Sequence, residues 1–245
     1  MRAAFSLFLL LLCTFTSHAQ ETLTPKQAKA KFEKADKALN EAWAAVKAAL
    51  PEVDFNKLKE SQRAWVEYRD YLARSPLYTG ADAQGDLALD SPDYLAAAAE
   101  LEDMRTEWLQ ALVRARQHAE DNLTGVWTDS YGGTLQIIER EGKLFFNIEC
   151  VRGPTFHMGS LSGIADWNQT IGWFSDKGRE ADKEEVTNLS FVVRDYQLEV
   201  TGANTNHYHG ARAYFDGSYL KTGPLDAGRQ AKVIEAAKTG VMVEE

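Results

Sequence analysis

The first half of the chain repeats apolar and charged residues with the period of an α-helix. Apolar residues recur every three or four positions, with Lys, Glu and Asp between them, in three segments: 24–50, 54–74 and 91–121. Thr24 and Pro25 form a typical N-cap and first-turn pair, Pro51 ends the first segment, and Asp54 is placed to cap the second. The pattern predicts three antiparallel helices, with a long loop at 75–90 before the third.

The same period indicates which side chains of the second and third helices face the core. In the second helix they are Leu58, Gln62, Trp65, Arg69 and Leu72. In the third helix they are Leu95, Leu101, Met104, Trp108 and Leu112. A buried arginine must be paired and hydrogen-bonded. We therefore expect Arg69 to find its partner among Glu41, Asp70 and Glu107.

At Leu123 the period changes to two, which is the period of a β-strand. Eight short runs follow: 124–129, 133–139, 144–151, 156–164, 170–175, 186–193, 196–201 and 208–220. Turn signals rich in Gly, Asn, Asp and Pro separate them, as in an antiparallel barrel or sandwich. After Pro224 a short terminal helix is expected at about 225–238. The predicted fold class is α+β, with helices first and strands second.

The N-terminus has the pattern of a secretory signal. Arg2 precedes an apolar run from Phe5 to Leu12, and Ser17 and Ala19 place small residues at positions −3 and −1 of a cleavage site. The run is too short to span a bilayer, which takes about 20 apolar residues. We therefore expect a periplasmic or secreted protein without a membrane anchor. The predicted parts are a signal peptide at 1–19, a helical domain at 20–122, a β-barrel-like domain at 123–222 and a C-terminal helical tail at 223–245.

Charge and cysteine content narrow the range of partners. Removal of the signal peptide removes Arg2 and leaves 26 basic and 36 acidic residues, a net charge of −10. This balance disfavours nucleic acid and anionic membrane surfaces as partners. It is compatible with a cationic partner, and equally with acidity that only keeps the protein soluble. Cys150 is the only cysteine that remains, so no intramolecular disulfide is possible.

Three short motifs in the helical half carry a family resemblance. They are Leu39-Asn40 with the aromatic Trp43, Gln62-x-x-Trp65-x-x-x-Arg69-Asp70, and Arg105-Thr106-x-x-Leu109. In order and spacing they resemble the N-terminal domain family of the LprI-like lysozyme inhibitors, over about residues 25–120. The resemblance implies a non-enzymatic protein that binds another macromolecule, such as lysozyme. The family's signature residues in this chain are Asn40, Gln62, Trp65, Arg69, Asp70 and Arg105.

We expect these signature residues to be structural. Gln62, Trp65 and Arg69 are spaced to share one helix face, where an internal polar network would set the register of the helices. A direct binding surface is the alternative. The chain departs from many family members at two cysteine positions that imply a bridge across the long loop. Leu72 and Ala97 occupy those positions here, which leaves the 75–90 loop less constrained.

The β half carries looser resemblances. Gly125-Val126-Trp127 looks like the Gly-x-Trp that begins the first strand of lipocalin-type barrels, although a Trp after a turn is also common core material. Residues 210–221 are similar to the last strand of small periplasmic β-domains that are associated with LprI-like proteins. These likenesses imply a location and not an activity.

The chain lacks the residue patterns of common catalytic sites. Residues 159–163 read Gly-Ser-Leu-Ser-Gly, with Leu where a nucleophile elbow needs Ser. The chain also lacks a phosphate-binding glycine loop, and Cys150 has no fixed His partner. We therefore expect no enzymatic activity and no cofactor.

Histidines are the candidates for a metal site. His207 and His209 are expected in or beside a strand, where positions i and i+2 point to one face. His157 would complete a set of three imidazoles. Its spacing from the pair is uninformative, and aromatic-rich barrels often present surface histidines. We predict no metal site.

Two functions from different classes remain. The first is an exported binding protein that inhibits lysozyme by surface complementarity, since an acidic protein is steered toward a basic one. The second is a small-ligand carrier that holds an apolar molecule inside the β-barrel. Large inward side chains in the barrel would argue against the carrier. A hydrolase would require a catalytic constellation that the sequence does not contain.

Overall fold

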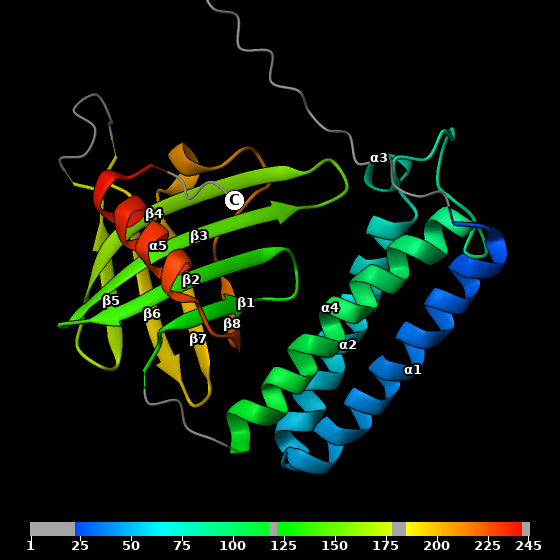
Figure 1. The fold of residues 1–245 in the computed structure, drawn as a ribbon, viewed down its shortest axis with the longest axis horizontal. Helices are drawn as coiled ribbons and strands as arrows, with labels where there is room; N and C mark the ends of the chain where they lie inside the picture. The colour runs from blue at the N-terminus through cyan, green and yellow to red at the C-terminus, as the bar shows by residue number, and fades with distance from the viewer. Residues whose placement is uncertain (1–22, 118–121, 178–184, 242–245) are drawn as a thin grey trace, which may run out of the picture.

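The computed structural model describes residues 23–117, 122–177 and 185–241 of the 245-residue chain. A group of helices and a β-barrel lie side by side, with the helices on the right and the barrel on the left in Figure 1. The predicted signal peptide lies outside the described residues. No helix among the described residues has the length and apolar character needed to cross a membrane.

The N-terminal part consists of three long helices and one short one. They are α1 (Pro25–Ala49), α2 (Glu52–Ala73), α3 (Pro76–Thr79) and α4 (Pro92–Gln117). Thr24 and Gln27 form a capping box at the start of α1, as the Thr-Pro pair predicts. The predicted cap at Asp54 is wrong, because α2 already begins at Glu52 with Pro51 at its N-cap. Asp54 lies in the first turn instead, where its charge favours the helix N-terminus.

Helix α4 is the centre of this part, because it packs against α1, α2 and strand β8 of the barrel. The core between the helices contains Trp65, Leu109 and Leu112, each at most 1% exposed. The prediction that Met104 faces the core is wrong, since Met104 is 50% exposed and the next residue, Arg105, is buried. Because α4 has α1 on one side and the barrel on another, its buried face is wide. That face includes the charged residues Glu102 and Arg105, which a search for apolar residues alone does not find.

Backbone and side-chain bonds hold the loop between α2 and α4. The Leu87 amide donates to the Arg74 carbonyl at 2.8 Å, and Arg74 Nε donates to the Leu87 carbonyl at 3.3 Å. Arg74 also pairs with Asp86 at 3.4 Å. Leu72 and Ala97, which occupy the family's cysteine positions, are buried in the same core as Leu87. Apolar packing and the Arg74 bonds thus connect the loop to the helices without a disulfide.

The C-terminal part is a closed antiparallel barrel of eight strands, not a sandwich. Each strand pairs with the next along the chain, and β8 pairs with β1. The strands are β1 (Gly125–Thr128), β2 (Gly133–Arg140), β3 (Lys143–Arg152), β4 (His157–Trp167), β5 (Ile171–Ser175), β6 (Asn188–Arg194), β7 (Gln197–Ala203) and β8 (Gly217–Gly223). The predicted α+β class, with helices before strands, is confirmed.

The last predicted strand, 208–220, is wrong over its first half. Thr205–Tyr208 form a short 3-10 helix, η1, and strand β8 starts only at Gly217. The intervening loop sends Ala213 and Phe215 into the barrel core. The buried Tyr219 hydroxyl donates to the Phe215 carbonyl at 2.9 Å. Two apolar residues spaced by two therefore mark an inserted loop here, not a strand.

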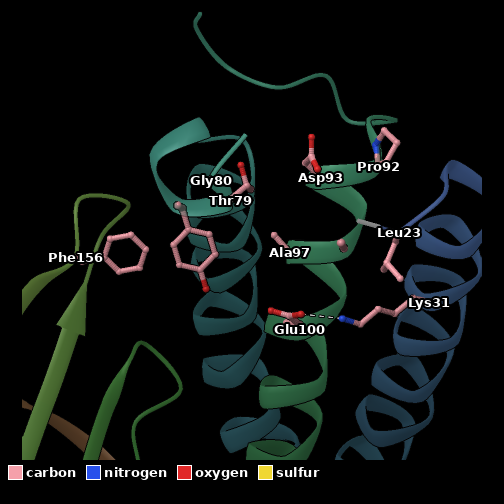
Figure 2. A pocket seen from close by; sticks show the side chains of 11 residues that line it. Leu23, Lys31, Thr79, Gly80, Pro92, Asp93, Ala97, Glu100 and Phe156 are labelled. Carbon is pink, nitrogen blue, oxygen red and sulfur yellow. Dashed lines mark hydrogen bonds and ion pairs between the residues drawn. The ribbon is translucent and has the colours of Figure 1, made fainter. Parts of the chain in front are cut away.

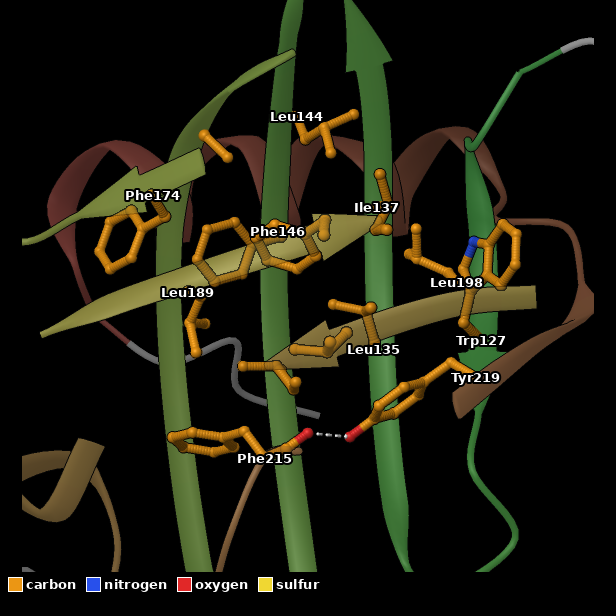
Figure 3. Close-up of a cluster of buried hydrophobic side chains, with 14 of the residues drawn as sticks. Trp127, Leu135, Ile137, Leu144, Phe146, Phe174, Leu189, Leu198, Phe215 and Tyr219 are labelled. Atoms are coloured by element: carbon orange, nitrogen blue, oxygen red, sulfur yellow. Dashed lines mark hydrogen bonds between the residues drawn. The ribbon is translucent and has the colours of Figure 1, made fainter. Parts of the chain in front are cut away.

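Large side chains fill the interior of the barrel. Figure 3 shows Phe146, Phe174 and Trp127 within the same cluster of buried residues. The Phe146 ring lies 5.1 Å from the Phe174 ring and 5.0 Å from the Phe191 ring, centroid to centroid. A Cβ atom at Gly163 would lie only 2.4 Å from the Phe174 ring. The glycine is thus needed for close packing.

The C-terminal helix α5 (Ala227–Thr239) lies across the outer face of the barrel, over β2, β3 and β4 (Figure 1). The Asp226 side chain caps it by accepting from the Arg229 amide at 2.9 Å. Val233 and Ala236 pack against Ile138 and the half-buried Phe145. This helix therefore covers apolar side chains that point outward from the barrel.

Candidate functional site

Arg69 of α2 lies in a charged network between α2 and α4. Its Nη1 pairs with Glu102 Oε1 at 2.6 Å, and its Nη2 pairs with Asp70 Oδ1 at 2.7 Å. The Tyr94 hydroxyl also donates to Asp70 Oδ1, at 2.8 Å. Of the three carboxylates predicted as partners, only Asp70 pairs with Arg69. Glu41 and Glu107 are exposed.

Glu102 was missed because it is a charged residue on an otherwise apolar face, and its side chain is fully buried. Burial raises the pKa of Glu102 to about 7, while the positive charge of Arg69 acts in the opposite direction. Burial alone would lower the pKa of Arg69, but the hydrogen bond and charge of Asp70 outweigh it and raise that pKa. The available sequence signal for Glu102 was its position three residues before Arg105, because residues at this spacing share one helix face.

Arg105 of α4 is buried where the helices meet the barrel. Its Nε donates to Gln62 Oε1 at 2.9 Å, and its Nη1 donates to Ser130 Oγ of the barrel at 2.6 Å. The guanidinium lies 4.3 Å from the ring of Trp108 and 5.4 Å from the ring of Trp65. Burial lowers the pKa of Arg105 to about 10. It therefore stays charged at neutral pH, although it forms no ion pair with any carboxylate in the described part of the chain.

A second buried arginine closes the barrel side of this interface. Arg152 of β3 pairs with Asp129 at 2.7 Å, and both side chains are at most 5% exposed. Arg152 Nη1 also donates to the Tyr131 carbonyl at 2.8 Å, and that carbonyl accepts from the Tyr68 hydroxyl of α2 at 3.2 Å. One carbonyl group thus connects the barrel ion pair to the helices.

The structure brings together five of the six predicted signature residues. Gln62, Trp65 and Arg105 form one cluster. Arg69 and its partner Asp70 lie beside this cluster, with the Arg69 guanidinium carbon 6.0 Å from the centre of the Trp65 ring. Asn40 does not join them. It is exposed on α1, where its amide donates to the carbonyl of Asp36 at 2.9 Å.

The predicted arrangement of the histidines is wrong. His207 lies in the 3-10 helix η1, and His209 forms an isolated bridge with Gly159, so the two do not share a strand face. The His157 ring contacts the Thr155 hydroxyl at 2.8 Å. No group of three potential metal-binding side chains occurs among residues 23–117, 122–177 and 185–241.

The end of the helices next to the barrel carries a pocket of about 560 Å³ (Figure 2). Helix α4 supplies Asp93, Ala97 and Glu100, and the Glu100 carboxylate pairs with Lys31 of α1 at 2.8 Å. On its other side, Tyr78 stacks on Phe156 of the barrel with ring centroids 5.6 Å apart.

Acidic and apolar side chains are exposed around this end of the helices. Residues 75–104 contain no Lys or Arg. The exposed aspartates of this stretch include Asp82, Asp86, Asp90 and Asp93, and we call these four the acidic tip. Leu77 and Leu89 are 67% and 57% exposed in the same stretch. The sequence signal was the Asp-rich composition of the predicted loop, which sequence reasoning treated only as a connection.

A comparison with known protein families finds a match for the helical part of the chain. The family model described as Lysozyme inhibitor LprI matches residues 13–112. No curated protein and no solved structure matches the chain. The matched range includes all six signature residues and the acidic tip, whereas the barrel lies beyond it. Residues 13–112, which include most of the helical part, are thus similar to the lysozyme inhibitor LprI family, and an eight-stranded barrel follows them.

Proposed function

We propose that this protein is an exported, non-enzymatic inhibitor that binds a cationic lysozyme through the acidic tip. The observation that carries the proposal is that the acidic tip, with its exposed leucines, lies on the part of the chain that matches the lysozyme inhibitor family. Opposite charges steer two proteins together, and exposed apolar side chains become buried when they meet. The signal at 1–19 would deliver the protein to the periplasm or the medium.

The interior position of two signature residues, Trp65 and Arg105, supports this assignment of the surface. Trp65 and Arg105 are each 1% exposed, so a partner protein does not reach them without opening the helices. Their role is to hold α2 against α4, and a family motif can define a scaffold while contacts lie elsewhere. The acidic tip is the part of the scaffold that combines negative charge with exposed leucines.

The filled barrel argues against a small-ligand carrier. A carrier of this type needs an interior that accommodates a ligand. Here Phe146, Phe174 and Phe191 meet at ring distances of close to 5 Å inside the barrel. Inhibition by protein–protein contact does not require such a cavity, so the packing favours the first function.

The acidic tip can be tested by removing its charge. We expect the combined Asp82→Asn, Asp86→Asn, Asp90→Asn and Asp93→Asn variant to inhibit lysozyme about tenfold less effectively than the wild type, since it loses the four negative charges of the acidic tip, of which Asp86 also pairs with Arg74. The measurement is clearing of a cell-wall suspension by lysozyme. The matched control is the combined Glu52→Gln, Glu60→Gln, Glu67→Gln and Glu107→Gln variant, which removes four exposed charges from helices α2 and α4, away from the tip. Equal losses in the two variants would refute a specific role of the tip.

Salt should weaken inhibition by the intact protein. Between about 0.05 and 0.5 M salt the Debye length contracts about threefold, so attraction between exposed charges declines. We expect the inhibitor concentration for half inhibition to rise steadily over this range, with lysozyme activity alone measured at each salt level. An absence of inhibition at micromolar excess against several types of lysozyme would exclude the proposed function.

A further inference from the structure

A second pocket, of about 570 Å³, lies where the helices meet the barrel. Its volume falls within the range of about 300 to 1,000 Å³ that small-molecule sites span. Helix α2 contributes Asp54 and Lys57 to the lining, and the barrel contributes the β6–β7 hairpin and the start of β8. Small-molecule sites often occur where two parts of a protein meet. The pocket therefore has both the size and the position of such a site.

Three tyrosine rings line this pocket: Tyr131, Tyr196 and Tyr214. The Arg116 guanidinium carbon lies 5.4 Å from the centre of the Tyr196 ring, and that of Arg152 lies 4.3 Å from the centre of the Tyr214 ring. Tyr214 nevertheless remains 45% exposed. Side chains that are already held in place lose little freedom when a ligand packs on them. The rings are therefore prepared for a flat, partly apolar ligand surface.

Five polar side chains of the lining form no hydrogen bond or ion pair with any residue in 23–117, 122–177 or 185–241. They are Asp54, Lys57, Asp195, Gln197 and Ser218. Carboxylates only accept hydrogen bonds and an ammonium group only donates them, whereas an amide or a hydroxyl does both. A ligand that satisfies all five must both donate and accept at several neighbouring positions. Hydroxyl groups meet this requirement, because each is a donor and an acceptor.

The charges of the lining nearly balance. Four aspartates and three basic residues line the pocket, namely Asp54, Asp129, Asp195 and Asp216 against Lys57, Arg105 and Arg194. Such a balance gives little net attraction to a strongly charged ligand of either sign. A neutral molecule with many hydroxyls fits this lining better. A sugar has this composition, and the C–H groups on the face of its ring form an apolar surface that packs against an aromatic ring.

We propose that this pocket binds a neutral oligosaccharide. The faces of its sugar rings pack against Tyr196 and Tyr214, and its hydroxyls hydrogen-bond to the five polar side chains from α2, the β6–β7 hairpin and β8. The pocket shares no residue with the acidic tip, so this site does not depend on the inhibitor function.

The experiment uses the full chain labelled with ¹⁵N and three neutral trisaccharides as probes: maltotriose, cellotriose and triacetylchitotriose. With at least one of them, the backbone amide resonances of Tyr196 and Ser218 should shift and saturate below about 10 mM. The indole resonance of Trp173, which is 53% exposed on β5, should not shift. Sorbitol carries hydroxyls without a ring face and should bind at least about tenfold more weakly. Equal binding of sorbitol, or no saturable shift with any trisaccharide, would overturn the proposal.

Two variants assign the affinity to the pocket, with the tightest-binding trisaccharide followed at the backbone amide of Ser218. Tyr214→Leu removes a ring face and should weaken binding about fivefold. Gln197→Ala removes an amide and should weaken binding about threefold. Tyr71→Leu removes an exposed tyrosine of α2 outside the pocket and should leave the affinity unchanged. If Tyr214→Leu does not fold, Gln197→Ala decides alone, and unchanged affinity in that variant would refute the site.

Discussion

The substitution Arg152→Met is expected to lower the free energy of unfolding by about 3 to 5 kcal/mol. It removes one partner of a buried ion pair and leaves Asp129 charged and 5% exposed in the protein interior. It also removes three hydrogen bonds to the carbonyls of Tyr131 and Tyr214. Urea denaturation followed by circular dichroism measures the loss.

The control for this prediction is Arg140→Met, which removes an exposed arginine whose one ion pair among the described residues is with the neighbouring Glu141. A surface pair of this kind contributes at most about 1 kcal/mol. A similarly small loss of free energy of unfolding in Arg152→Met would contradict the prediction. It would show that Asp129, once left without Arg152, becomes protonated or hydrated at little energetic cost. The double variant Arg152→Met, Asp129→Asn should recover part of the stability, because no isolated charge then stays buried.

The substitution Glu102→Gln is expected to change how stability depends on pH. In the folded protein the pKa of Glu102 is raised to about 7, so the folded state holds this proton more tightly than the unfolded state does. Its contribution to stability is fully present below about pH 4.5 and is lost as the pH rises through about 7. Each unit of pKa shift corresponds to about 1.4 kcal/mol, so the wild type should lose about 2 to 3 kcal/mol from this group.

Glutamine has nearly the same shape as glutamate but does not titrate. The Glu102→Gln variant should therefore lack the loss of stability that the wild type shows as the pH rises. Its free energy of unfolding relative to the wild type should increase between pH 4.5 and 7.5. Glu107→Gln, on the exposed side of the same helix, should follow the wild-type profile. Parallel profiles for the wild type and Glu102→Gln would mean that Arg69 keeps Glu102 ionised throughout the range.

The period of apolar residues correctly predicted which helix faces are buried wherever the buried side chains are apolar. It failed on α4, where Glu102 and Arg105 are buried and Met104 is exposed. These two charged residues are buried because Arg69 and Ser130 supply hydrogen-bonding partners from other elements. Such partners come from tertiary packing, which the local pattern of a single helix does not contain.

The barrel shows the same limit in a different form. The alternation of residues predicted seven strands in roughly the right places, and burial alternates strictly in the short strands β1 and β5. At 208–216 the same alternation occurs in a loop, because Ala213 and Phe215 fill the core without a strand partner. The acidic tip was visible in the sequence only as composition. Its position beside the Tyr78–Phe156 stack depends on how the helices and barrel meet.

Strand β8 has a consequence for the order in which the molecule is completed. It closes the barrel by pairing with β1, with Val126 opposite Gly223. Its Leu220 is also part of the core between the helices. Contacts between such distant parts of a chain form slowly. A chain that emerges from its N-terminus first would therefore hold both an open sheet and an incomplete helical core until its last strand arrives. A truncation before residue 217 should consequently impair both parts of the protein at once.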